Sequence, residues 1–190
     1  PRVRRENGVV AMEPKLFAVY LGGRAPKCNI ELHDVAFVVG ASIEETYEQL
    51  LEEWFGSPEN LHLDSWFEVK VVDGHRVTLS EEPFRGTAKL FFVNVGGYLP
   101  NKFIEFHETG FVVAEAAREV KDAARAKLLV GMSSVHTDDV FDVDDCIELS
   151  RIGRFYIHLA KTEAPDEMVL TNGYHIIPKP IVQDWLARRR

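Results

Sequence analysis

The sequence predicts an α+β fold in which two tandem ββαββ repeats with antiparallel sheets pack as one pseudo-twofold body. The first observation is a duplication, because segments 15–39 and 89–113 align without a gap at an offset of 74 residues. The second is that each segment holds two runs of alternating apolar residues, the pattern of half-buried strands, followed by residues at helical spacing. Repeats of this size bury too little surface to be stable alone, so the two copies are expected to share a buried interface.

Each strand of the repeat follows from its local pattern. The four strands are expected at 16–21, 29–39, 61–72 and 76–79 in the first copy, and at 90–95, 103–113, 135–149 and 154–159 in the second. The pairs Gly22–Gly23 and Gly96–Gly97 are interpreted as part of the loops that join the first two strands, because glycine permits positive φ. The first two strands of each copy therefore form a hairpin with a wide loop.

One helix is predicted in each copy, after the second strand. In the first copy Ser42 and Glu45 have the spacing of a capping box, and Gly56 marks the end of the helix. In the second copy the alanine-rich segment 116–129 carries its apolar side chains on one stripe, formed by Val120, Ala123, Ala124 and Leu128. Each helix is expected to cover one face of its sheet.

The repeats define the expected boundaries along the chain. These are an N-terminal extension at 1–14, the first repeat at 15–82, the second repeat at 88–163, and a C-terminal tail at 164–190. In the tail, Asn172–Gly173 indicates a turn, and Pro180 suits the first position of a short terminal helix. Ile181, Val182 and Trp185 give this helix an apolar stripe by which it docks on the body.

Composition limits the classes of function. The net charge of −8 disfavours a nucleic-acid partner, which requires a basic face. No apolar run reaches the length that crosses a membrane, so no membrane association is expected. Cys28 and Cys146 form neither a CxxC pair nor a disulfide framework, and no signal peptide is evident. We therefore expect the reducing environment of the cytoplasm.

Strand alternation gathers histidine and carboxylate side chains on one face of each sheet. On the second strand Glu31 and His33 share a face with Phe37. On the third strand His62 and Asp64 are expected to share a face with Trp66 and Glu68, whereas Leu61, Leu63, Phe67 and Val69 face the helix. The same offset of 74 residues adds four candidates from the second copy, namely Glu105, His107, His136 and Asp138. His33 with His62, and His107 with His136, are predicted to approach each other across neighbouring strands.

The chemistry of these eight candidates has more than one interpretation. Two imidazoles and two carboxylates suit a divalent metal such as Zn, Mn or Fe, and a carboxylate beside histidine also suits acid–base chemistry. The alternatives are a hydrogen-bonded network that closes the interface between the repeats, and a solvated sheet face. If Phe37 is buried, the polar face is covered by the other repeat or by a partner. Sequence alone does not separate these cases, because a structural constraint is repeated as readily as a site.

Longer strings show a resemblance to a known family. LGGRAPKCNIELHDVAFVVG and NLHLDSW in the first copy, with VGG, DDVFDVDDC and YIHL in the second, resemble a bacterial family catalogued as domain of unknown function 1543. The resemblance covers about 15–159 and implies no activity, cofactor or catalytic residue. Whether the protein is an enzyme stays open. The first hypothesis is a protein that binds a small molecule or a divalent metal, and the alternative is a non-catalytic interaction module that forms a homodimer or binds a partner.

Overall fold

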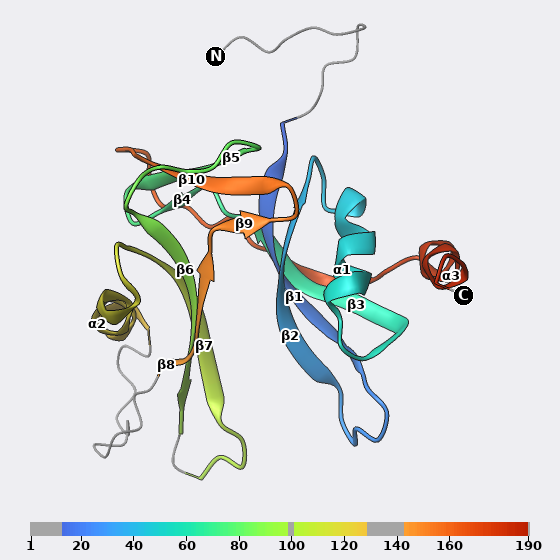
Figure 1. The fold of residues 1–190 in the computed structure, drawn as a ribbon. Coiled ribbons are helices and arrows are strands. Elements are labelled where there is room, and N and C mark those ends of the chain that lie inside the picture. The colour runs from blue at the N-terminus through green and yellow to red at the C-terminus, as the bar shows by residue number, and fades with distance from the viewer. Residues whose placement is uncertain (1–12, 99–100, 129–142, 190) are drawn as a thin grey trace, which may run out of the picture. The chain divides into compact units, whose positions relative to one another are not determined.

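The computed structural model describes residues 13–98, 101–128 and 143–189, and it divides the chain into two compact units. Unit 1 combines 1–69 with 168–190, and unit 2 spans 70–167. Every strand pair described is antiparallel, and helices accompany the sheets, so the α+β class is confirmed (Figure 1). The repeat boundaries 15–82 and 88–163 describe the duplication in the sequence and stay a prediction.

Unit 1 is a four-stranded sheet with helices on one of its faces. The sheet order is β11-β3-β1-β2, and the strands are β1 (Lys15–Arg24), β2 (Leu32–Gly40), β3 (Ser57–Glu68) and β11 (Thr171–Ile176). A short 3-10 helix (Glu44–Thr46) leads into α1 (Tyr47–Glu53), and α3 (Lys179–Ala187) is the C-terminal helix. The buried residues Val19, Leu50 and Leu63 lie in one core between sheet and helices. The terminal helix predicted around Pro180 is therefore confirmed.

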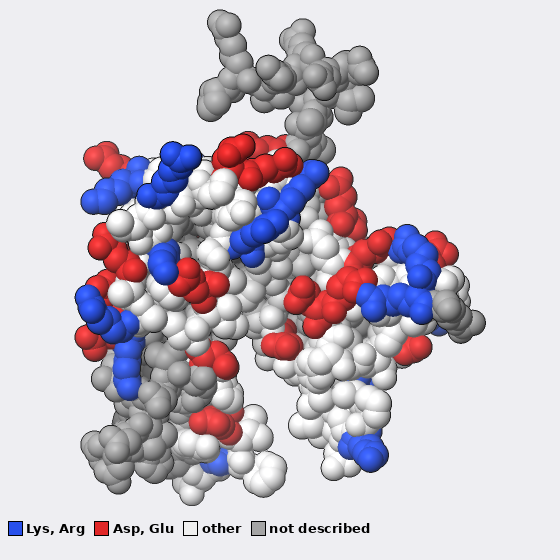
Figure 2. Space-filling model, in the orientation of Figure 1, with Lys and Arg blue, Asp and Glu red and all other residues white. Residues whose placement is uncertain are grey.

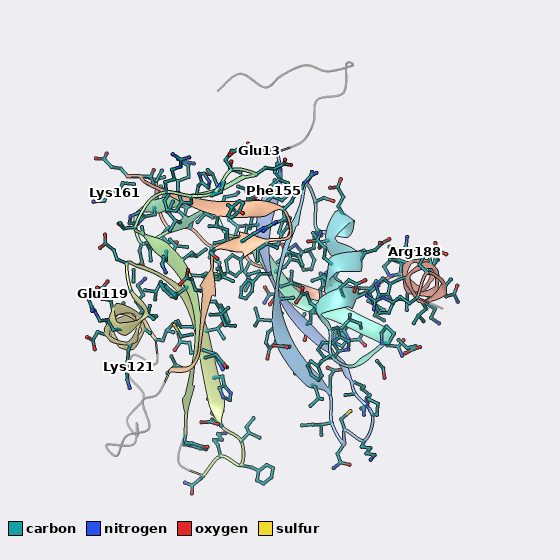
Figure 3. The ribbon with its side chains drawn as sticks, in the orientation of Figure 1. Glu13, Glu119, Lys121, Phe155, Lys161 and Arg188 are labelled. Atoms are coloured by element: carbon teal, nitrogen blue, oxygen red, sulfur yellow. The ribbon has the colours of Figure 1, made fainter. Side chains whose placement is uncertain are left out.

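The helix α3 is held on α1 by polar contacts as well as by its apolar stripe. Val182 is buried, and Trp185 packs beside the core and donates from Nε1 to Glu52 Oε1 at 2.8 Å. Arg188, labelled in Figure 3, pairs with Glu48 at 2.7 Å. The segment before α3 differs from the prediction. Asn172–Gly173 forms no chain-reversing turn but lies inside β11, where the pairing with β3 is irregular between Asn172 and His175.

Unit 2 contains a three-stranded sheet, a second small sheet and one helix. The three-stranded sheet has the order β7-β6-β8, with β6 (Lys89–Gly97), β7 (Phe106–Ala114) and β8 (Val143–Leu149). The small sheet has the order β4-β5-β10-β9, with β4 (Val71–Val72), β5 (His75–Ser80), β9 (Arg151–Ile152) and β10 (Phe155–Lys161). The helix α2 (Ala117–Lys127) covers Phe91, Val93 and Val112 with the predicted stripe around Val120 and Ala124.

The register of the first two strands confirms the duplication at the level of single residues. Gly22 of β1 pairs with His33 of β2, and Gly96 of β6 pairs with His107 of β7. Both residue numbers of the second pair are therefore 74 higher than those of the first. The third strands break this rule. Tyr20 pairs with Ser65, whereas its counterpart Asn94 pairs with Asp145. The paired residues of the two third strands therefore differ by 80 in residue number, and not by 74. The expected counterparts of His62 and Asp64, His136 and Asp138, precede the described part of this strand, and their equivalence stays a prediction.

A β-bulge at Asp64 changes which side chains of β3 share a face. Tyr20 pairs with Ser65 and Leu21 pairs with Leu63, so Asp64 has no direct partner on β1. One extra residue reverses the alternation beyond it. Trp66 therefore packs against the helix-side core with Leu63, and Phe67 pairs with Ala18 on the opposite face. The prediction that Trp66 shares a face with His62, and Phe67 with Leu63, is wrong for this reason.

Two smaller expectations also differ from the structure, and the burial of Phe37 is intermediate. The second strand begins at Leu32, and Ile30 is 72% exposed instead of facing the helix. The residue at the N-cap of the 3-10 helix is Ile43 and not Ser42, although Glu45 accepts from the Ala41 N–H at 2.9 Å, as the second half of a capping box would. Phe37, the residue expected to report a covered face, is partly buried, and Leu16 and Val39 on the same face are fully buried.

Candidate functional site

Gly22 in the central strand β1 lies directly between two histidines. It pairs with His33 of β2 on one side and with His62 of β3 on the other. The two imidazoles are therefore two strands apart, not on neighbouring strands as predicted, and they meet above a residue that has no side chain. A Cβ added to Gly22 would lie 2.4 Å from His62 Nε2 and 2.9 Å from Asp64 Oδ2. Glycine in a strand interior marks such a close approach.

The interpretation of Gly22–Gly23 as a loop is corrected by this arrangement. Both glycines belong to β1, and neither has a positive φ. Gly23 makes room on its own side of the sheet, because a Cβ there would lie 2.8 Å from Trp54 Cζ2. The two glycines are therefore explained by crowding above and below the sheet, and not by the conformational freedom of a turn.

The side chains of four residues converge above Gly22. His33 Nε2 lies 3.1 Å from Asp64 Oδ2 and 3.6 Å from Glu31 Oε1. His62 Nε2 lies 3.5 Å from Asp64 Oδ1 and 3.5 Å from Glu31 Oε1. Each carboxylate thus faces both imidazoles. The structure brings together all four candidates from the first copy, and the bulge at Asp64 turns that carboxylate toward the two rings.

The protonation of the His62 ring follows from its backbone contact. His62 Nδ1 lies 3.0 Å from the carbonyl oxygen of Asn60. A carbonyl only accepts, so Nδ1 carries a proton, and in the neutral ring the lone pair is on Nε2. This Nε2 is buried and has no hydrogen-bond partner in the described part of the protein, and the side chain is 1% exposed. An unpaired polar atom at this depth is unfavourable unless something binds it.

Four nitrogen–oxygen distances in the site can be compared with the spacing of ligand atoms around a metal ion. An ion with four tetrahedral bonds of about 2.0–2.2 Å holds its ligand atoms about 3.3–3.6 Å apart. The four nitrogen–oxygen distances of the site, 3.1 to 3.6 Å, lie at or near this range. Within 13–98, 101–128 and 143–189, however, no group of three or more His, Cys, Asp or Glu side chains has a geometry that could hold a metal ion. An ion would have to draw the side chains together.

Two tyrosines that the sequence did not single out flank the imidazoles. The Tyr20 ring stacks on His33 with an angle of 2° between the planes and 5.2 Å between centroids. The Tyr174 ring lies over His62, with 4.1 Å between centroids. Burial, and then the negative charges of Asp64 and Asp34, raise the pKa of Tyr20, so its hydroxyl keeps its proton. Tyr20 was recognisable as a strand residue, but Tyr174 joins the site only because β11 pairs with β3.

The second copy reproduces part of the arrangement. His107 Nε2 lies 3.7 Å from Glu105 Oε2, close to the spacing of His33 and Glu31, and His107 pairs with Gly96 as His33 pairs with Gly22. His136 and Asp138 lie outside the described residues. The register places Asp144 at the bulge position that Asp64 occupies in the first copy.

Fold and site together describe an internally duplicated α+β protein with one His–carboxylate cluster in its first copy. The family model described as Domain of Unknown Function (DUF1543) matches residues 28–79 and 102–150, one segment in each copy, and the chain belongs to this family. The fold is similar to the crystal structure of a protein Il1583 from Idiomarina loihiensis, with 36% identity, a TM-score of 0.68, and coverage of 88% of this chain and 99% of that one. No curated protein matches the chain.

Two features of the described residues bear on the classes of function considered above. No described helix is long and apolar enough to cross a membrane. Figure 2 shows acidic and basic side chains interspersed on the visible face, without a continuous basic surface there.

Proposed function

We propose that the protein binds one divalent transition-metal ion through Glu31, His33, His62 and Asp64. The observation that carries the proposal is the buried Nε2 of His62, which has no hydrogen-bond partner and faces a carboxylate oxygen of Glu31 and one of Asp64 at 3.5 Å. A lone pair that faces two negative oxygens is repelled unless a cation lies between them. A proton on Nε2 would donate a hydrogen bond, which the geometry does not provide, so a metal ion is the better candidate.

The ligand types favour zinc, manganese or iron over calcium or magnesium. Imidazole suits the first-row transition metals, whereas Ca²⁺ and Mg²⁺ bind almost entirely through oxygen. The Asn60 carbonyl that accepts from His62 Nδ1 is the usual second contact of a metal-bound histidine, because it fixes the ring orientation and the free nitrogen. Glu31, His33 and Asp64 are all partly exposed, so an ion has a route from solvent.

We expect one ion per chain. The first copy supplies two imidazoles over Gly22, but the displaced third strand of the second copy has Asp144 at the bulge. The described third strand of the second copy, β8 (Val143–Leu149), contains no histidine, so the expected ion rests on the donors of the first copy.

The test is the metal content of the tag-free, full-length protein, measured by elemental analysis after exchange into buffer with equimolar zinc, manganese and iron(II). Wild type should retain about one ion per chain, and His62→Gln should lose it. His75→Gln is the matched control, because His75 Nδ1 also contacts the carbonyl two residues earlier, at 2.8 Å from Asp73 O, but in unit 2. It should retain the ion.

Two results would overturn the proposal. One is a wild-type protein that retains no ion and melts at the same temperature with and without chelator, which would leave the structural network as the function of the four side chains. The other is a His62→Gln protein with undiminished metal content, which would show that the ion is bound elsewhere.

A further inference from the structure

The cluster of four metal-binding candidates is surrounded by large exposed apolar side chains. Tyr20 is 42% exposed and stacks on His33, and Tyr174 is 62% exposed and lies over His62. Ile176, 44% exposed, pairs directly with His62 across the sheet and therefore lies on the same face. We call Tyr20, Tyr174 and Ile176 the apolar rim. Binding sites for small molecules usually combine a few polar groups with a larger number of apolar side chains.

Four protein donors would leave two positions unfilled around an ion that prefers six ligands. Four donors satisfy a tetrahedral ion, but manganese, iron(II) and cobalt(II) accept six, which leaves two positions. Three of the four donors are partly exposed, whereas His62 is buried, so an ion held by these residues would be reached by a ligand from the solvent side. A ligand with two adjacent oxygen donors fills two such positions at once.

We propose, on the basis of the metal site proposed above, that the site takes a small organic ligand with a bidentate oxygen head and an aromatic or apolar body. The head binds the ion and the body packs on Tyr174 and Ile176. A protein partner fits less well, because three rim side chains provide far less surface than the roughly 800 Å² per partner of a stable interface.

Tyr174 is the residue expected to set the preference for an apolar body. Its ring contacts His62 on one side and leaves most of its surface free. It lies where the pairing of β11 with β3 is interrupted between Asn172 and His175, next to Gly173, whose φ of +151° favours glycine. The ring can therefore adjust to a ligand without breaking the flanking pairs Asn172–Ser65 and His175–Leu63.

The experiment compares two hydroxamates that share a chelating head. Acetohydroxamate and benzohydroxamate are titrated into cobalt(II)-loaded, tag-free protein, and visible absorption of the cobalt reports both ion occupancy and the change in coordination. Affinities are normalised to those of the same compounds for cobalt(II) in buffer. We expect benzohydroxamate to bind about tenfold more tightly, equivalent to about 1.4 kcal/mol, the size of one good aromatic contact.

Substitutions at Tyr174 connect the preference to the rim. Tyr174→Ala should keep cobalt and lose most of the tenfold preference, whereas Tyr174→Phe should keep both. Tyr156→Ala, in unit 2, is the control and should match wild type.

The outcomes separate this inference from the metal site on which it rests. A protein that takes up no cobalt overturns both. A protein that takes up cobalt but binds the two hydroxamates equally, or whose preference survives Tyr174→Ala, overturns the ligand inference and leaves the metal site standing. A Tyr174→Ala protein that no longer binds cobalt would also overturn it, since the ring would then belong to the ion site.

Discussion

Substitution of Gly22 by alanine tests the geometry of the site most directly. The added Cβ would lie 2.4 Å from His62 Nε2 and 2.9 Å from Asp64 Oδ2, whereas ordinary contacts begin at 3.4 Å. His62 must therefore move by about 1 Å or rotate, although it is buried and bound to the Asn60 carbonyl. Overpacking of this kind costs about 1–3 kcal/mol. For a chain of this length, that corresponds to a fall in melting temperature of roughly 2–12 °C.

The same methyl group would occupy the space in which the donors converge, so Gly22→Ala should also lose the ion. Gly23→Ala is the matched control on the neighbouring residue. Its Cβ would lie 2.8 Å from Trp54 Cζ2 on the helix side of the sheet, so it should destabilise the protein to a similar degree but retain the metal. The assay is thermal unfolding with and without zinc at about 100 times the dissociation constant, where a bound ion adds about 2.7 kcal/mol.

Two readings of this experiment would refute the reasoning. If Gly22→Ala is as stable as wild type within about 0.5 kcal/mol, the crowding above Gly22 is absent. If Gly22→Ala and Gly23→Ala respond equally to zinc, the ion is not held above Gly22. The comparison of neighbours matters because both substitutions change the same strand by the same single methyl group.

Two further predictions concern Tyr20 and Asp73. Tyr20 has a pKa raised above 10.0, so the folded state holds its proton more tightly, and this contribution to stability is complete below pH 10 and is lost as the pH rises through the folded-state pKa. As the pH rises from about 9 to 11, Tyr20→Phe should therefore lose less of its free energy of unfolding than wild type, as measured by denaturant melts. An identical loss in both proteins would exclude the raised pKa of Tyr20. In unit 2, Asp73 Oδ2 accepts from the Val113 N–H at 2.9 Å and Oδ1 pairs with Lys127. Asp73→Ala should cost about 1 kcal/mol and speed amide exchange at Val113, and unchanged exchange there would contradict the role assigned to the carboxylate.

Much of the fold could be predicted because local patterns determine it. Alternation along β1 and β2 predicted the correct faces for His33 and Phe37, and the offset of 74 predicted that the two hairpins correspond residue by residue. The apolar stripe of α2 and the terminal helix at Pro180 were also predicted, since periodicity and caps act within a few residues. The four candidates of the first copy lie together, although β2 and β3 flank the central strand β1 and are not neighbours as predicted.

Tertiary pairing decided the rest of the site. The bulge at Asp64 adds one residue to a ladder, and a pattern of period two cannot register this until the partner strand is known. The pairing of β8 with β6 is displaced by six residues from the offset of 74, and sequence periodicity does not reveal this shift either. Tyr174 comes from the far end of the chain and reaches His62 only through the pairing of β11 with β3. The sequence by itself determined which residue types lie on each strand. Long-range strand pairing placed Gly22 between His33 and His62, where the missing side chain makes room for the two imidazoles and the two carboxylates.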